Sequence, residues 1–460
     1  MAIIKLVLAS FVSLLAFAAG RKAQNQQFQG RQCQLRRITT TQPSHRIQSE
    51  GGTTEVWDPM EDQFQCAGVA AMRDTIEPNS LSLPQYFPAP LMIYIVKGRG
   101  ILGVNIPGCP ETYHPEQQSP SGRRMGTGGR EDRHQKLHRV VTGDVIAIPH
   151  GSAHWCYNDG NEDLVAVYVV DLNNNNNQLD QNLRGFMLAG GQSRQGRERG
   201  SRRSHSVEDT FQNVFSAMDE QLLAESFNVP TELARKVQQV NGRGTIVKCD
   251  PQMRILSPSD EEGEEYRHGM NMEEENGIEE TMCTMHIKHN TDFRREADLH
   301  TTQAGRINLV AAEKLPILQL LEMSAERGHL MPNAMHSPHW SMTDQRVVYG
   351  LQGEVHIQVV DETGNTVMDE MVREGDLFVI PQFYACVARA GNNGFEYVAF
   401  KTSGEPMKSP MAGYTSVMRA MPFDVVANSY SDMSPEEALQ VKMSRDPESM
   451  LFSPTRRSID

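Results

Sequence analysis

The sequence has little of what several large classes of protein require. After the first twenty of its 460 residues, no apolar run is long enough to cross a membrane as a helix, so we expect no membrane span. Lys and Arg number 44 against 58 Asp and Glu, and the net charge of −14 would repel a nucleic-acid backbone. Seven cysteines are too few for a disulfide-built scaffold, and no Asn-x-Ser/Thr sequence offers an N-glycosylation site. We therefore expect hydrophobic cores to hold the fold, and no nucleic acid as a partner.

The N-terminus is the exception to this shortage of apolar runs. Lys5 precedes a mostly apolar stretch from Leu6 to Ala19, which ends in small residues. This pattern is typical of a secretory signal peptide, which we place at residues 1–20. A Gln-rich lead follows over residues 21–37. The secretory pathway permits disulfides, although the odd number of cysteines leaves at least one unpaired within the chain.

From about residue 38 onward, short apolar runs alternate with Gly, Pro and Asn, as is typical of an all-β barrel or sandwich. The pattern occurs twice. Pro78-Asn79 returns as Pro332-Asn333, 254 residues later, and GDVIAIP at 143–149 returns as GDLFVIP at 375–381, 232 residues later. We infer that one β-domain was duplicated and that the first copy carries extra residues in a loop.

Each copy is followed by sequence with helical spacing. Residues 207–239 carry apolar residues three and four positions apart and are interrupted by Pro230. Ser434, Pro435 and Glu437 supply an N-cap, a first-turn proline and a capping-box glutamate for a helix over 438–443. The sequence therefore predicts a mainly β protein with two jelly-roll barrel domains, at 38–256 and 277–460, each followed by a small helical extension. An acidic loop over 257–276 connects them.

One segment fits a specific metal-site motif, G-x5-P-x-G-x2-H-x3-N, at every fixed position: Gly143, Pro149, Gly151, His154 and Asn158. It is the second motif of the cupins, so we expect two tandem cupin domains. In cupin enzymes this His is one of four metal ligands. The other three come from a first motif, H-x-H followed after three or four residues by Glu, with Gly seven positions later.

The first copy lacks those other ligands. Counting back from Gly98, the Glu position falls on Leu91 and the two His positions fall on Pro84 and Tyr86. One imidazole cannot hold a transition metal, so we expect a buried structural role for His154, and no metal or other cofactor.

The second copy has lost its ligands as well. Counting from Gly353, the three first-motif places hold His339, Ser341 and Arg346, and the second motif reads Pro381, Phe383, Cys386 and Ala390. The chain is therefore predicted not to be an enzyme. The alternative is a bicupin metalloenzyme of the oxalate oxidase or decarboxylase type.

Several other segments resemble the 11S (legumin-type) seed globulins, and the resemblance covers nearly all of the chain after the signal peptide. They are Arg36-Arg37-Ile38, IQSEGG at 47–52, FQCAG at 64–68, PGC at 107–109, NGIEE at 276–280, AGNNGFE at 390–396 and AGYTSV at 412–417. The resemblance implies a seed storage protein, a nutrient reservoir delivered to the protein storage vacuole.

The resemblance also implies roles for single residues. Cys33 would pair with Cys66, and Cys109 with Cys283, while the state of the other three cysteines stays open. A vacuolar asparaginyl endopeptidase would cut between Asn276 and Gly277, and trimers, formed alone or with other 11S subunits, would stack into hexamers after the cut. One feature departs from the family, whose C-terminal chain is basic: residues 277–460 hold 16 Lys and Arg against 25 Asp and Glu. A vicilin-like cupin that binds sugars or small ligands is disfavoured by the Asn-Gly site and the Cys109/Cys283 pair.

Overall fold

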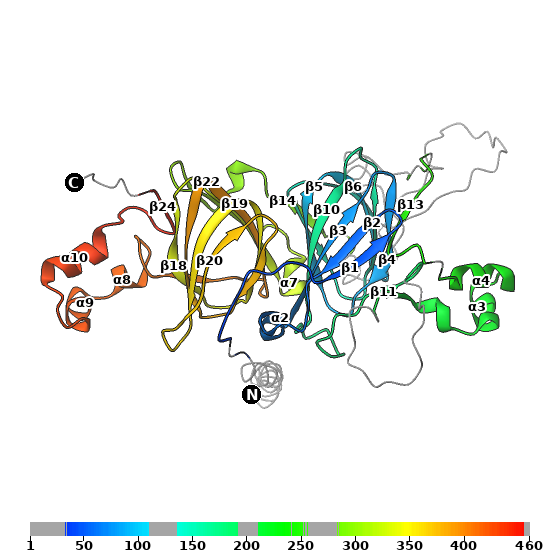
Figure 1. Ribbon diagram of the computed structural model, residues 1–460, viewed down its shortest axis with the longest axis horizontal. Helices are drawn as coiled ribbons and strands as arrows, with labels where there is room; N and C mark the ends of the chain where they lie inside the picture. Colours follow the sequence, from blue (N-terminus) through cyan, green and yellow to red (C-terminus); the bar gives the residue numbers. More distant parts are fainter. Residues whose placement is uncertain are drawn as a thin grey trace, which may run out of the picture.

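The computed structural model describes residues 33, 35–109, 136–191, 210–240, 242–251, 253, 255, 283 and 285–454. The signal peptide at 1–20, most of the lead at 21–37, the acidic loop at 257–276 and the Asn276-Gly277 site lie outside the described residues. Two β-barrels stand side by side, with helices projecting from opposite ends of the molecule (Figure 1). Within the described ranges, no helix combines the length and apolarity that a membrane crossing requires.

The first barrel consists of two sheets. One runs in the order β1 (His45–Ser49), β2 (Gly52–Val56), β3 (Val69–Ile76), β10 (Leu164–Asp171), β5 (Leu91–Lys97), β8 (Asp144–Ile148) and β14 (Lys288–Asn290). The other runs in the order β12 (Gln212–Asn213), β11 (Phe186–Met187), β4 (Ser80–Tyr86), β9 (Ala153–Asn158), β6 (Arg99–Asn105) and β7 (Lys136–Val141), with β13 (Ile246–Lys248) also paired to β4. Strands β5, β8 and β10 are almost continuously apolar because they are buried on both faces.

The second barrel repeats this design with longer strands. Its sheet runs in the order β15 (Leu299–Thr301), β16 (Gly305–Val310), β17 (Ser324–Leu330), β22 (Ala385–Lys401), β18 (Met335–Ser341) and β23 (Lys408–Pro410). Strand β19 (Arg346–Val360) pairs with β22, β20 (Thr366–Arg373) and β21 (Leu377–Ile380), and β24 (Leu451–Phe452) pairs with β18. The register of β19 against β22 shifts near Gly353, whose φ is +77°, so β19 bends from one side of the barrel to the other.

The two barrels share backbone features at the repeated positions, which confirms the predicted duplication. Asn79 and Asn333 both have positive φ, at 55° and 60°. Gly143 and Gly375 have φ of 89° and 82° in the turns before β8 and β21. Asn and Gly tolerate this left-handed conformation better than other residues, so the recurring sequence marks recurring turns.

The predicted helical extensions are present. After the first barrel come η3 (Val214–Ala217), α3 (Glu220–Phe227) and α4 (Thr231–Gln238), with Pro230 at the N-cap of α4. Helix formation starts later than the predicted residue 207, because Gln212–Asn213 pairs with β11 as a strand. After the second barrel come α8 (Val417–Ala420), α9 (Phe423–Ser429) and α10 (Pro435–Met443), and the expected capping box between Ser434 and Glu437 forms.

The barrels exchange segments with each other. The chain before the first barrel lies on the second: Leu35 and Ile38 are buried in its core, and the Ile38 N–H donates to the carbonyl of Val367 at 2.8 Å. In the other direction, β14 precedes the second barrel in sequence yet pairs with β8 of the first. Between them, α2 (Asp62–Ala67) contacts β21, and α7 (Leu318–Leu321) contacts β8. One continuous hydrophobic core therefore spans the contact between the barrels.

Candidate functional site

The residues that matched the cupin motif lie around strand β9 of the first barrel. Gly143 and Gly151 hold turns with φ of +89° and +71°, and the carbonyl of Pro149 accepts a backbone hydrogen bond in the second of these turns. The Asn158 side-chain amide donates to two backbone carbonyls, at 2.7 and 2.8 Å. Four of the five motif residues thus form turns and strand ends, and His154 alone offers a metal-ligand side chain.

His154 is buried, and no other metal-ligand side chain lies beside it in the described structure. Its side chain stacks on Phe87, with 5.9 Å between the ring centroids, and its Nδ1 lies 3.3 Å from the carbonyl oxygen of Ser152. Its Nε2 has no hydrogen-bond partner among the residues the structure describes. Burial lowers the pKa of His154 to about 4, so the ring is neutral at neutral pH.

The residues that face His154 are not those we expected. Pro84 and Tyr86 were predicted at the two missing His positions, but both are only half-buried. The register of β4 against β9 places Gln85 beside His154, and Phe87 stacks on its ring. The prediction was wrong by one residue. It assumed four residues between the H-x-H pair and the Glu position of the first cupin motif, whereas three apply here. Because side chains alternate between the two faces of a strand, this shift exchanges the residues that face His154. Neither an amide oxygen nor a phenyl ring completes a transition-metal site.

In the second barrel, an arginine occupies the place of the missing glutamate. Arg346 begins β19, and its Nη1 donates to Nε2 of His339 at 2.5 Å, while its Nη2 donates to Sγ of Cys386 at 3.3 Å. His339 Nδ1 lies 2.7 Å from the carbonyl oxygen of Ser337, so we place the imidazole proton on Nδ1. Burial lowers the pKa of His339 well below its usual value, and the ring is neutral. The guanidinium fills the position where a cupin metal would need a carboxylate.

The remaining second-copy positions have structural roles. Ser341 donates to Asp344 at 2.5 Å, and Ala390 is buried in the barrel core. Phe383 follows Pro381 in the turn before β22 and is 64% exposed. Its backbone has a positive φ of 67°. The second copy has thus kept the backbone conformation that glycine adopts at 151 in the first.

A buried ion cluster lies next to these residues and was missed by the sequence reasoning. Glu326 on β17 accepts hydrogen bonds from Lys401 (2.8 Å), Lys408 (2.7 Å) and the hydroxyl of Tyr397 (2.8 Å). Despite the burial that opposes charge, the two ammonium groups hold the pKa of Glu326 well below its usual value. Burial also lowers the pKa of Lys408, to about 8. The sequence offered no clear signal for this cluster, because β17 reads SAERGHL and Glu326 does not stand out in so polar a strand.

Neither barrel offers a set of metal ligands. Within the described part of the chain, no group of three or more His, Cys, Asp or Glu side chains is placed to hold a metal ion. At the four positions that hold metal ligands in cupin enzymes, the first barrel has Gln85, Phe87, Leu91 and His154. At the same four positions, the second barrel has His339, Ser341, Arg346 and Cys386. A cation in the second barrel would meet the guanidinium, and the residues present do not fit a cupin metal.

Comparison with known proteins identifies the family. A cupin family model matches residues 38–193 and 293–437. The 11S globulin seed storage protein 2 of Sesamum indicum is 49% identical, over 98% of this chain and 99% of that protein. This chain belongs to the 11S globulin family of cupins. The solved structure of the coconut allergen cocosin matches this chain with a TM-score of 0.80 and 39% identity, over 92% of this chain and 100% of the cocosin chain. Pumpkin seed globulin matches with a TM-score of 0.79 and 36% identity, over the same shares of the two chains. The predicted family and fold are confirmed.

The structure places the cysteines of this globulin as follows. Cys33 is bonded to Cys66, and Cys109 to Cys283, with Cα–Cα distances of 4.5 and 5.4 Å. The second disulfide joins residues 174 positions apart, and it anchors the segment that leads into β14 on the first barrel, before the chain crosses to the second. The free cysteines are Cys156, Cys249 and Cys386, of which the first and last are buried.

Proposed function

We propose that this 11S globulin is a nutrient reservoir of the seed, stored in protein storage vacuoles and without catalytic activity. The main support is that the described residues of the two barrels form no metal-ligand set, while the chain matches a storage globulin along 98% of its length. A second relative, from Anacardium occidentale, is also named an 11S globulin seed storage protein and is 43% identical. Immunoblots of the plant of origin should show accumulation in maturing seed and loss during germination. A constant level through both stages would contradict the proposal.

The rival function is that of a bicupin metalloenzyme. Metal analysis of the purified protein separates the two, because such an enzyme needs manganese or iron in near-stoichiometric amounts. We expect far less than one such ion per chain, and the same content in the His154→Gln variant. Stoichiometric metal that disappears in that variant would overturn the storage proposal.

The proposed maturation is a cut between Asn276 and Gly277 by an asparaginyl endopeptidase. The cut falls in an acidic, Gly-containing stretch, and Cys283 lies seven residues beyond Asn276. The bond from Cys283 to Cys109 would therefore keep the two products joined.

A gel tests the cut directly. Treatment with the protease, followed by reduction, should release chains of roughly 28 and 20 kDa, at about 110 Da per residue. The Asn276→Ala variant should remain a single chain, and Asn271→Ala, a matched change in the same acidic stretch, should be cut normally. Cutting of both variants would show that the site is misplaced.

The proposed assembly, trimers followed by hexamers, finds support in the helical extensions, which project at opposite ends of the elongated molecule (Figure 1). Both expose large apolar side chains: Leu222, Phe227 and Leu233 on α3 and α4, and Val425, Leu439 and Val441 on α9 and α10. Exposed apolar patches mark interaction surfaces, and a contact between two different ends of identical chains forms a ring when the rotation between neighbouring chains closes on itself.

Substitution of one end tests the ring. Leu222→Asp and Val441→Asp should each convert trimers into monomers in size-exclusion chromatography with light scattering. Met60→Asp, at a side chain of similar exposure outside the extensions, should leave trimers intact. Persistence of trimers in both extension variants would rule out this contact.

A further inference from the structure

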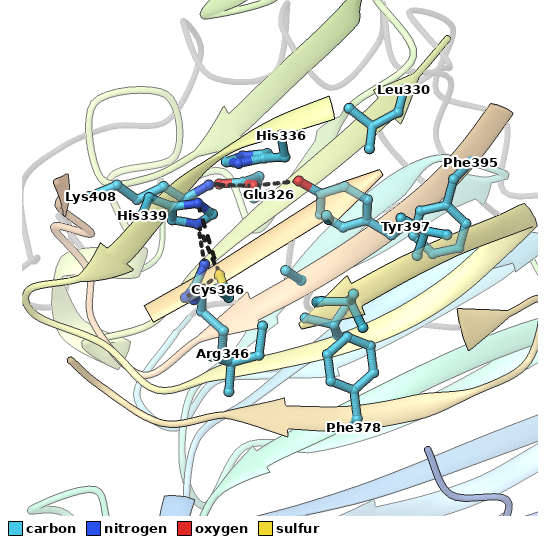
Figure 2. Close-up of a pocket in the computed structure, with 16 residues that line it drawn as sticks. Glu326, Leu330, His336, His339, Arg346, Phe378, Cys386, Phe395, Tyr397 and Lys408 are labelled. Atoms are coloured by element: carbon cyan, nitrogen blue, oxygen red, sulfur yellow. Dashed lines mark hydrogen bonds and ion pairs between the residues drawn. The ribbon is translucent and has the colours of Figure 1, made fainter. Parts of the chain in front are cut away.

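The second barrel encloses a cavity with a polar and an apolar end. Its volume is about 50 Å³, room for a molecule of about three to five non-hydrogen atoms, given that one water needs about 10–15 Å³ of such space. Figure 2 shows His336, His339, Arg346 and Lys408 gathered at one end, and Phe378 and Phe395 at the other. The lining residues come from strands β17, β18, β19, β21, β22 and β23, so a rigid barrel wall holds them.

Positive charge is in excess at the polar end. Two buried cations, Arg346 and Lys401, and the half-buried Lys408 lie near two buried carboxylates, Glu326 and Asp344. Both lysines bind Glu326, and Asp344 accepts a hydrogen bond from a serine. The cluster therefore holds one positive charge more than its carboxylates balance. An unbalanced charge taken out of water is costly unless a counter-ion accompanies it.

Arg346 carries this unmatched charge. It is 4% exposed, and its hydrogen bonds go to His339 and Cys386, neither of which is a carboxylate. Its Nε has no partner in the described part of the structure. Guanidinium groups buried in proteins favour planar oxyanions, which take two N–H donors at once.

A second unpartnered group lines the same cavity. His336 is 4% exposed, and its Nε2 has no hydrogen-bond partner among the described residues. Its ring lies 4.2 Å from that of His339, and its Nδ1 makes one long contact, 3.3 Å, to the carbonyl oxygen of Ser337. Because a carbonyl oxygen only accepts, the imidazole proton lies on Nδ1, as in His339, and Nε2 presents a lone pair to the cavity.

We propose that this cavity binds a small monocarboxylate, of the size of formate or acetate, with its carboxylate toward Arg346 and its unpartnered Nε. Its alkyl part would lie toward the apolar side chains Val348 and Phe378. The anion would supply the missing charge and the missing partner of Arg346, and the cavity volume favours a molecule smaller than a sugar or an aromatic acid. This proposal is independent of the storage function, since a reservoir protein needs no ligand.

Calorimetric titration of the full-length, uncut protein with sodium acetate tests this site, with acetamide as the uncharged molecule of the same shape. We expect saturable binding of one acetate per chain and at least tenfold weaker binding of acetamide. Absence of saturable acetate binding, or equal binding of both molecules, would overturn the proposal.

Variants locate the site. Arg346→Met should lower the affinity for acetate at least tenfold. The control is Arg373→Met, at a side chain of the same barrel that is 69% exposed, and it should bind normally. If Arg346→Met does not fold, as judged by near-ultraviolet circular dichroism, Arg346→Lys replaces it, since it keeps the charge but loses the two-pronged donor. Unchanged affinity in the folded Arg346 variant would place the acetate elsewhere and refute the assignment.

Discussion

Trp57 of the first barrel meets Tyr349 of the second edge to face, with 6.2 Å between the ring centroids. Both side chains are buried, and Arg73 of the first barrel donates to the Tyr349 hydroxyl at 3.2 Å. The indole Nε1 of Trp57 donates to the carbonyl of Thr41, in the segment that crosses between the barrels. The boundary is thus packed like the interior of a domain, and the polar atoms of Trp57, Arg73 and Tyr349 have hydrogen-bond partners there. Changes at the boundary should act on the stability of the whole chain.

Asp171, at the end of β10 near this boundary, makes the protein sensitive to rising pH. Burial raises the pKa of Asp171 to about 7, from an ordinary value of 3.8. The folded chain therefore holds this proton more tightly than the unfolded chain does. The stabilisation is complete below about pH 4 and is lost as the pH rises through about 7.

The Asp171→Asn variant removes the ionisation and keeps an oxygen for the hydrogen bond from Asn174. We expect little change in the free energy of unfolding at pH 4 and a gain of about 2–4 kcal/mol at pH 8, since one pKa unit corresponds to about 1.4 kcal/mol. Denaturant titrations at both values measure this. Asp163→Asn, at an exposed position, should change neither. An equal effect of Asp171→Asn at both pH values would contradict the assignment.

Loss of the Glu326 carboxylate should strongly lower the free energy of unfolding of the second barrel. In Glu326→Gln, two buried ammonium groups lose their only carboxylate hydrogen-bond partner in the described structure. Removal of one member of a buried ion pair costs about 3–5 kcal/mol. The matched change Glu354→Gln, at an exposed pair with Arg373, should cost no more than about 0.5 kcal/mol. Calorimetric melting of both variants tests the difference, and similar melting temperatures would show that the cluster adds no stability.

Replacement of Phe383 by glycine should increase the stability of the protein, although it removes a large side chain. Its φ is +67°, and the left-handed conformation costs a residue with a Cβ roughly 1–2 kcal/mol. Part of that gain is offset, because glycine is more flexible in the unfolded chain. We expect Phe383→Gly to stabilise the protein by about 0.5–1 kcal/mol. The reverse change at the repeated position, Gly151→Ala, should destabilise it by a similar amount, because its φ is +71° and a Cβ there would meet nothing within 4 Å. Opposite signs in denaturant unfolding would support this reasoning, and equal signs would refute it.

Local sequence patterns predicted the features that depend on local chemistry. The recurring Pro-Asn and Gly-Asp turns, the break at Pro230 and the cap at Ser434 all follow from the conformations that these residues favour. The one-residue error at Pro84 and Tyr86 arose because strand register depends on the partner strand. The Glu326 cluster and the passage of Leu35 and Ile38 to the second barrel were not predicted, because both depend on contacts between residues far apart in the sequence.

The last prediction concerns the chains that the proposed cut would produce. Residues before residue 276 would supply Leu35 and Ile38 to the second barrel, and residues after it would supply β14 to the first. Fully buried Leu, Ile, Val or Phe side chains each contribute roughly 1.5–3 kcal/mol, so a few of them offset the entropy of association. The cut protein should therefore stay together in size-exclusion chromatography under reducing conditions, although a denaturing gel separates its chains.

The cut Cys109→Ser variant, which lacks the disulfide, should likewise stay together without reductant. As a control, Ile38→Asp together with Cys109→Ser should weaken the association, since it places a carboxylate in the second core. Dissociation of the cut Cys109→Ser protein in buffer alone would show that the disulfide, and not the shared core, holds the two chains together.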